Sequence, residues 1–262
     1  MSGVTLNTPP TIKADLTDEE LASLIAETAG EVLLALRDSK LFDGKALGNI
    51  GDRTANTFIM SALQFHRPKD AILSEEEKDS PARLSSSRVW IVDPLDGTRE
   101  YGEGRSDWAV HIALAIDGKA QLGAVALPGL SLTLNSAQPP IRPIATGKPR
   151  MLVSRTRPAC EALAVAEKLG AELVPMGSAG AKAMAVLRGE ADIYLHSGGQ
   201  YEWDSCAPVA VAHAAGLHVS RIDGSPCRYN RENPYMPDLL ICLPEFAQAV
   251  LEAMKNIPSA AI

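Results

Sequence analysis

The feature that most constrains the fold is a short apolar run, residues 89–92, which leads directly into Asp-Pro-Leu-Asp-Gly-Thr at residues 93–98. Apolar residues bounded by turn-forming residues in this way predict a buried strand. Pro94 has no N–H to donate to a neighbouring strand, so we expect the strand to end there. Gly97 lets a ligand approach the backbone closely, and Thr98 is expected to begin the next turn or helix. The stretch therefore predicts a buried strand whose end carries polar groups.

Two carboxylates lie at this predicted strand end. Asp93 and Asp96 are hard anionic oxygen donors in the same turn, and the Leu95 carbonyl between them is a third oxygen. Mg²⁺ prefers oxygen ligands in near-octahedral geometry. The N–H groups of Gly97 and Thr98, at the start of a turn or helix, are suited to hold a phosphate. The pattern indicates metal-assisted phosphoryl chemistry, and a simple turn with solvated carboxylates stays open as the alternative.

Composition narrows the classes of protein and partner. The chain has 262 residues, 46% of them hydrophobic, which is enough for one large domain or two closely packed subdomains. A net charge of -7 argues against a broad basic surface for nucleic acid, so an anionic substrate needs metal ions or a local cationic pocket. The four cysteines form no C-x-x-C pair, which argues against a zinc or redox motif. No secretory signal opens the chain and no apolar run reaches the ~20 residues of a membrane span, so we expect a cytoplasmic protein.

Further carboxylates of the first half fall at the ends of predicted elements. Thr17 and Glu20 fit a capping box for an amphipathic helix. A glycine-containing loop is expected next, with Asp52 as the N-cap of a second helix. A strand at 71–74 runs directly into Glu75. Because strand ends line the ligand crevice in open α/β sheets, we expect Glu75 to lie near the carboxylates of the central strand.

The rest of the chain alternates between strands and helices. The Asp117-Gly118 pair is a hairpin turn between two predicted strands, and residues 136–149 lack any periodicity. Beyond them strands and helices alternate, and Asp204 stands at the start of a helix that it could simply cap. We expect a mixed α/β fold with an N-terminal α+β subdomain over residues 1–147 and a C-terminal α/β subdomain over residues 148–262.

Three motifs in this order resemble the inositol monophosphatase superfamily of Mg²⁺-dependent, lithium-sensitive phosphatases. They are Leu73-Ser74-Glu75-Glu76, Trp90 to Thr98, and Tyr201-Glu202-Trp203-Asp204. Within the superfamily the chain is most similar to the CysQ-type bisphosphate nucleotidases of bacteria, through residues 97–101, 107–114, 177–182 and 224–230. The resemblance implies a layered α-β-α-β-α sandwich of the inositol monophosphatase and fructose bisphosphatase type. Its N-terminal subdomain would carry most metal ligands, and its C-terminal subdomain would complete the substrate site.

The resemblance also implies a metal site with two or three Mg²⁺ ions. Glu75, Asp93 and the Leu95 carbonyl resemble the ligands of a first ion. Asp93, Asp96 and Asp204 resemble those of a second. A third ion would depend on Glu75 and water. These five residues are therefore the expected metal ligands.

The same resemblance assigns roles around the metals. Asp52 and Thr98 resemble the pair that orients and deprotonates the attacking water, and the amides of Gly97 and Thr98 would hold the scissile phosphate. A second phosphate on the substrate needs cations, and arginine suits bidentate phosphate binding. The candidates, each of which could equally be an ordinary surface cation, are Arg155, Arg157, Lys182 and Arg228. Family position further suggests that Ser178 and Glu202 contact ribose hydroxyls.

The expected function is hydrolysis of the 3'-phosphate of 3'-phosphoadenosine 5'-phosphate to AMP and phosphate, a reaction of sulfate assimilation. One alternative keeps the chemistry and changes the small phosphorylated substrate to an inositol phosphate or fructose 1,6-bisphosphate, alone or in addition. A second is a haloacid-dehalogenase-like phosphatase, against which the D-x-x-D spacing argues, since that class uses D-x-D. A third is a non-catalytic binding module. No nucleic acid polymer or membrane is expected as a partner, and a homodimer stays open.

Overall fold

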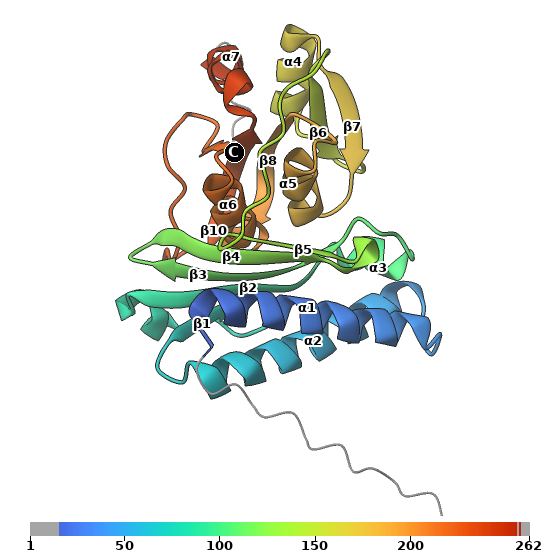
Figure 1. The fold of residues 1–262 in the computed structure, drawn as a ribbon, viewed down its shortest axis with the longest axis vertical. Coiled ribbons are helices and arrows are strands. Elements are labelled where there is room, and N and C mark those ends of the chain that lie inside the picture. The colour runs from blue at the N-terminus through green and yellow to red at the C-terminus, as the bar shows by residue number, and fades with distance from the viewer. Residues whose placement is uncertain (1–15, 256, 258–262) are drawn as a thin grey trace, which may run out of the picture.

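The first half of the chain forms a five-stranded sheet covered on one face by two long helices. The computed structural model describes residues 16–255 and 257 (Figure 1). The strand order is β1-β2-β3-β4-β5, and β1 alone runs parallel to its neighbour. The elements are α1 (Asp18–Asp38), α2 (Gly44–His66), β1 (Ala71–Ser74), η1 (Pro81–Ser85), β2 (Arg88–Asp96), α3 (Thr98–Gly102), β3 (Ala109–Ile116), β4 (Lys119–Leu127), η2 (Pro128–Leu130) and β5 (Leu132–Asn135).

The second half forms another five-stranded sheet, of order β7-β6-β8-β10-β9. β6 runs parallel to β7 and β8, and β10 runs antiparallel to β8 and β9. α5 and α6 lie between the two sheets, and α4 and α7 cover the outer face of the second sheet (Figure 1). The elements are β6 (Arg150–Ser154), α4 (Cys160–Leu169), β7 (Glu172–Met176), α5 (Ala179–Leu187), β8 (Ile193–Tyr201), α6 (Glu202–Ala214), β9 (His218–Ser220), β10 (Tyr235–Cys242) and α7 (Pro244–Lys255).

Side-chain alternation along β2 explains why its sequence is apolar without interruption. Trp90 and Val92 pack toward α1 and α2, whereas Val89 and Ile91 pack toward the middle layer of helices. Both faces of the strand are therefore buried, as in sheets covered by helices on both sides. Full burial of a side chain of this size stabilises the fold by about 1.5–3 kcal/mol. The expected α-β-α-β-α layering is confirmed.

The first helix and the central hairpin form as predicted. The Glu20 N–H donates to Thr17 Oγ1 at 3.2 Å, and the Thr17 N–H donates to Glu20 Oε2 at 3.0 Å, which completes the capping box. Asp117 and Gly118 have φ values of 49° and 73°, as a tight hairpin turn between two right-handed twisted strands requires.

The second helix begins earlier than expected, at Gly44, so Asp52 lies inside α2 and is not its N-cap. We predicted a loop from the glycines that precede Asp52, but two of them serve close packing. A Cβ on Gly48 would lie 2.8 Å from Thr98 Cγ2, and a Cβ on Gly51 would lie 2.8 Å from Tyr101 Cε1. These glycines let α2 approach α3 closely.

The central strand also continues past Pro94, contrary to expectation, and ends at Asp96. Its register with β3 shifts between Asp93 and Asp96, so Pro94 lies in an irregular stretch of the strand. The missing N–H of Pro94 therefore removes no regular ladder hydrogen bond.

The predicted subdomain boundary near residue 147 falls in the irregular segment between β5 and β6. Division into separate folding units stays a prediction, and residues 1–15, 256 and 258–262 lie outside the described part of the chain. Within that described part, no helix combines the length and the apolar character needed to cross a membrane.

Candidate active site

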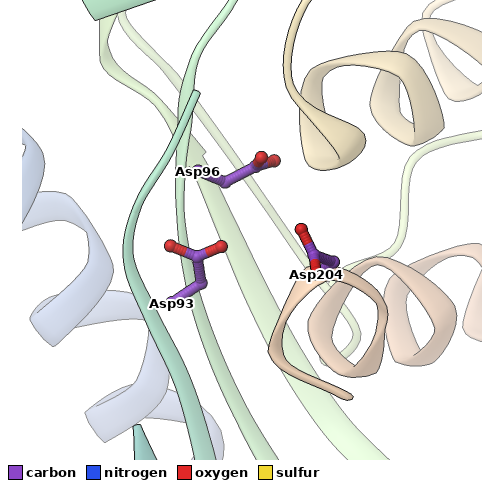
Figure 2. Close-up of side chains that lie close together, drawn as sticks. All are labelled: Asp93, Asp96 and Asp204. Carbon is purple, nitrogen blue, oxygen red and sulfur yellow. The ribbon is translucent and has the colours of Figure 1, made fainter. Parts of the chain in front are cut away.

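Three carboxylates from both halves of the chain meet in one place. Asp93 and Asp96 lie at the end of β2, and Asp204 lies in the first turn of α6 (Figure 2). One oxygen from each carboxylate lies within 4.8 Å of the others. This spacing allows all three groups to contact one cation.

Local backbone structure directs the two aspartates of β2. The Leu95 N–H donates to Asp93 Oδ1 at 3.0 Å, which orients that carboxylate inside the irregular end of the strand. Gly97 then turns the chain with φ at 89°, a left-handed conformation that favours glycine. A Cβ at Gly97 would also lie 3.1 Å from Ser178 Cβ. The tight turn thus depends on the glycine that the sequence motif contains.

Asp96 is held by several donors of the second half. Its Oδ2 accepts from Ser178 Oγ at 2.5 Å and from the Gly180 N–H at 2.6 Å, and its Oδ1 accepts from the Ala179 N–H at 3.1 Å. Burial alone would raise the pKa of Asp96, but the adjacent His111 and these donors lower it to about 2. Asp96 is therefore anionic at neutral pH.

The other two carboxylates have the opposite electrostatic environment. Burial raises the pKa of Asp93 well above its usual range, and the charges of Glu75 and Asp96 raise it further. Burial and then the charge of Asp96 raise the pKa of Asp204 to about 7, although the Tyr201 N–H donates to its Oδ2 at 2.7 Å. A donor set of carboxylate oxygens under mutual repulsion fits a hard divalent cation. Asp204 thus caps α6, as its position suggested, and also lies beside the two aspartates of β2.

Glu75 lies beside this cluster and is not part of the group of three. It follows β1 directly, is exposed, and its N–H donates to the Val92 carbonyl at 3.2 Å. Desolvation by its surroundings, followed by the charges of Asp52 and Asp96, raises the pKa of Glu75 to about 7. The strand-end position is as expected, and a role as a metal ligand stays a prediction.

Asp52 and Thr98 meet at the contact between α2 and α3. Thr98 Oγ1 lies 3.4 Å from Asp52 Oδ1 and 3.1 Å from the Leu95 carbonyl oxygen, so its proton is shared between two acceptors. Burial and then the charge of Glu76 raise the pKa of Asp52 to about 7. A carboxylate with such a pKa can accept a proton near neutral pH.

His111 is a site residue that we did not predict. Its Nδ1 donates to the Trp203 carbonyl at 3.0 Å, and its Nε2 lies 3.2 Å from Asp96 Oδ2 without a well-aligned hydrogen bond. Burial opposes protonation of the ring, but the Asp96 carboxylate outweighs burial and raises the pKa of His111. No local sequence signal marked His111, because its place in the site follows from the pairing of β2 with β3, which sets it opposite Asp93.

A hollow of about 460 Å³ opens beside the cluster and is lined by Asp96, Gly97 and Asp204. Four predicted substrate side chains also line it, those of Arg155, Arg157, Ser178 and Lys182, and all but Arg157 are engaged by the protein. Arg155 donates to Glu100 Oε1 at 2.8 Å, Ser178 donates to Asp96, and Lys182 Nζ donates to the carbonyls of Gly177 and Ser178. Contact of these four residues with substrate stays a prediction.

Two predicted substrate residues lie elsewhere. Glu202 is 0% exposed and accepts the N–H groups of Asn230 at 2.6 Å and Arg231 at 2.9 Å. The carboxylate therefore holds a loop, and the expectation that it meets a ribose hydroxyl was wrong. Arg228 does not line the hollow either, because the adjacent Tyr229 N–H donates to the Gly118 carbonyl at the far end of β3. That end of β3 pairs with Arg88, whereas Asp93 and Asp96 pair with His111 and Ala109 near the other end of the strand.

Comparisons with known proteins agree on one family. The model of the inositol monophosphatase family matches residues 20–258. A protein of Mycobacterium leprae named 3'-phosphoadenosine 5'-phosphate phosphatase is 47% identical over 260 residues, covering 94% of this chain and 96% of the relative. The 3'(2'),5'-bisphosphate nucleotidase CysQ of Escherichia coli is 30% identical over 230 residues, covering 81% of this chain and 94% of the relative. The structure of CysQ from Bacteroides thetaiotaomicron shares the fold with a TM-score of 0.74 and 24% identity, covering 87% of this chain and 99% of that one.

Proposed function

Since this chain belongs to the inositol monophosphatase family, whose members are metal-dependent phosphatases, we propose that it removes the 3'-phosphate of 3'-phosphoadenosine 5'-phosphate with Mg²⁺. The observation that carries this proposal is the meeting of Asp93, Asp96 and Asp204 within 4.8 Å. The name of the Mycobacterium leprae relative, at 47% identity, supports the choice of substrate. The products would be AMP and phosphate, which gives the enzyme a place in sulfate assimilation.

The three carboxylates would hold the cation, with Glu75 and the Leu95 carbonyl as further oxygen donors. Asp96 Oδ1 accepts only the Ala179 N–H among the described residues, so it keeps a lone pair for a metal. When bound, Mg²⁺ would lower the pKa of water and neutralise charge on the transferring phosphate. Two or three ions are proposed, as the number of donors allows.

Asp52 and Thr98 would act on the attacking water. The Thr98 hydroxyl donates its proton toward Asp52 and the Leu95 carbonyl, so its remaining lone pair can accept a hydrogen bond from water. Asp52, with a pKa near 7, would take up the proton that the water loses. The N–H groups of Gly97 and Thr98 would hold the phosphate during this step.

A screen of phosphate release with Mg²⁺ tests the substrate. The candidates are 3'-phosphoadenosine 5'-phosphate, inositol 1-phosphate and fructose 1,6-bisphosphate, compared by kcat/KM. We expect the highest kcat/KM on the adenosine bisphosphate. A higher kcat/KM on inositol 1-phosphate or fructose 1,6-bisphosphate would replace the proposed substrate while keeping the chemistry. No phosphate release from any of the three compounds would favour a binding module. Location in the cytoplasm and assembly as a homodimer stay predictions.

A further inference from the structure

Four cationic side chains line the hollow beside the carboxylates: Arg99, Arg155, Arg157 and Lys182. A substrate with a second, uncleaved phosphate needs a cation that can reach it, and the partners of each side chain decide which one can. A guanidinium group that is already paired with a carboxylate has part of its charge offset and some of its N–H donors in use.

Three of the four cations are engaged by the protein itself. Arg99 Nε donates to Glu103 Oε1 at 2.9 Å. Arg155 donates to both Glu100 and Glu103, at 2.8 and 2.6 Å. Lys182 is 5% exposed and donates to two backbone carbonyls of its own turn. Each of these three groups therefore shares its positive charge with partners that the protein already supplies.

Arg157 differs from these three. Within residues 16–255, its guanidinium has neither a hydrogen bond nor an ion pair, and the side chain is exposed. Its backbone is nevertheless fixed, because the Arg157 N–H donates to Ser154 Oγ at 3.2 Å. A free guanidinium on a fixed backbone can bind a phosphate through two parallel hydrogen bonds without breaking a protein contact.

Arg157 also stands where the hollow continues into a second one, of about 710 Å³. The two hollows share Ser154, Arg157, His196 and Gly199 as lining residues. A groove of this combined size can hold a substrate larger than a simple phosphate ester. Arg157 therefore lies along the path of a ligand that extends away from the carboxylates.

The neighbouring histidine adds no competing positive charge. The His196 Nε2–H donates to the Gly198 carbonyl at 2.7 Å. Burial and then the charge of Lys182 lower the pKa of His196 to about 4, so its ring is neutral near pH 7. Among the described residues, Arg157 is thus the unpaired positive charge where the two hollows join.

We propose that Arg157 binds the phosphate that is not cleaved, and that it makes the enzyme select a bisphosphate over a monophosphate ester. This inference rests on the proposed function. Hydrogen bonds to charged groups contribute about 1.5–3 kcal/mol each. Loss of this contact is expected to act on substrate binding, because the uncleaved phosphate carries the same charge before and during the reaction.

The test compares 3'-phosphoadenosine 5'-phosphate with adenosine 3'-monophosphate, which lacks the second phosphate. In Arg157→Gln, the ratio of kcat/KM for the bisphosphate to that for the monophosphate should fall by about 10- to 100-fold, mainly through KM. Arg157→Lys should retain part of the ratio. Arg155→Gln is the matched variant and should lower the ratio far less, because Arg155 is already paired with Glu100 and Glu103.

An unchanged ratio in Arg157→Gln, or a larger fall in Arg155→Gln, overturns the role of Arg157 and leaves the proposed function standing. Wild-type protein that releases no phosphate from either nucleotide overturns both. The melting temperature of Arg157→Gln should match that of the wild type within about 2 °C, since the guanidinium makes no hydrogen bond or ion pair with the described residues that the substitution would remove.

Discussion

The Ser178 hydroxyl donates to Asp96 Oδ2 at 2.5 Å and thereby joins the two halves of the chain at the candidate metal site. Ser178 is also the N-cap of α5, since its Oγ accepts the Ala181 N–H at 2.9 Å. One side chain therefore starts a helix of the second half and orients a carboxylate of the first. The site and the contact between the halves depend on the same group.

Replacing Ser178 should accordingly weaken the fold. Ser178→Ala removes a helix cap and a hydrogen bond to a charged carboxylate, so we expect the free energy of unfolding to fall by about 2 kcal/mol. Urea unfolding of the metal-free protein measures this. The control is Ser61→Ala, which removes an exposed hydroxyl that bonds only to its own helix at Thr57. Equal stability of the two variants would contradict the linking role of Ser178.

Gly48 should matter for the reaction although it carries no chemical group. In Gly48→Ala the new Cβ would lie 2.8 Å from Thr98 Cγ2 and push Thr98 away from Asp52. We expect kcat to fall by about 10- to 100-fold, because misplacement of a catalytic group by a fraction of an ångström is costly. KM should change little. Asn49→Ala, an exposed change on the same helix, serves as the control, and a wild-type kcat in Gly48→Ala would argue against the Asp52–Thr98 pair.

Crowding of carboxylates should make the metal-free protein less stable as pH rises. The pKa values of Asp52, Glu75 and Asp204 are raised to about 7 in the folded protein, whereas they lie near 4 in an unfolded chain. Between about pH 4 and about pH 7 the folded state holds these protons while the unfolded chain has already lost them, so the free energy of unfolding decreases as the pH rises through this window and levels off above it.

We expect the melting temperature of metal-free protein to fall by at least ~2 °C over this range, and saturating Mg²⁺ at pH 8 to restore it. Melting curves across pH, with and without Mg²⁺, measure this. A melting temperature that rises with pH in metal-free protein would show that the carboxylates do not repel one another as the structure indicates.

Glu202 should be needed for stability, not for substrate contact. In Glu202→Ala, the part-buried N–H groups of Asn230 and Arg231 would lose the carboxylate that accepts them, at a total cost of about 1–3 kcal/mol. We expect this variant to have a lower melting temperature than the wild type. At temperatures where it stays folded, its KM should lie within about 2-fold of the wild-type value, because substrate binding is retained. A large rise in KM with unchanged melting temperature would restore the substrate role that we assigned from the sequence.

The sequence predicted the fold through signals that act over short distances. The capping box at Thr17, the hairpin turn at Asp117 and the apolar run of β2 each specify their own element, and all of these formed. Gly48 misled because glycine favours loops in isolation, whereas here its missing Cβ admits Thr98. That contact joins residues far apart in the chain, and no local pattern reveals it.

For the candidate site, the carboxylates could be predicted from the sequence, whereas the substrate contacts could not. The resemblance to the inositol monophosphatase superfamily implied that Asp93, Asp96 and Asp204 converge, which the structure shows. Arg155 and Glu202 bear charges that suit a nucleotide, but whether a charge is free depends on its partners in three dimensions. Both are engaged by other parts of the protein, Arg155 by Glu100 and Glu202 by two backbone amides.

The most direct test of the central claim is phosphate release from 3'-phosphoadenosine 5'-phosphate during a Mg²⁺ titration of chelator-treated protein, in the wild type and in Asp93→Asn. We expect release by the wild type to require Mg²⁺, and kcat of Asp93→Asn at saturating Mg²⁺ to be lower by about 10³-fold, equivalent to ~4 kcal/mol of lost transition-state stabilisation. Asp93→Asn should remain folded, because it removes one carboxylate from a cluster in which the neighbouring carboxylates repel one another and raise the pKa of Asp93. Phosphate release that proceeds without Mg²⁺, or at a near-normal kcat in Asp93→Asn, would contradict metal-assisted hydrolysis at this site.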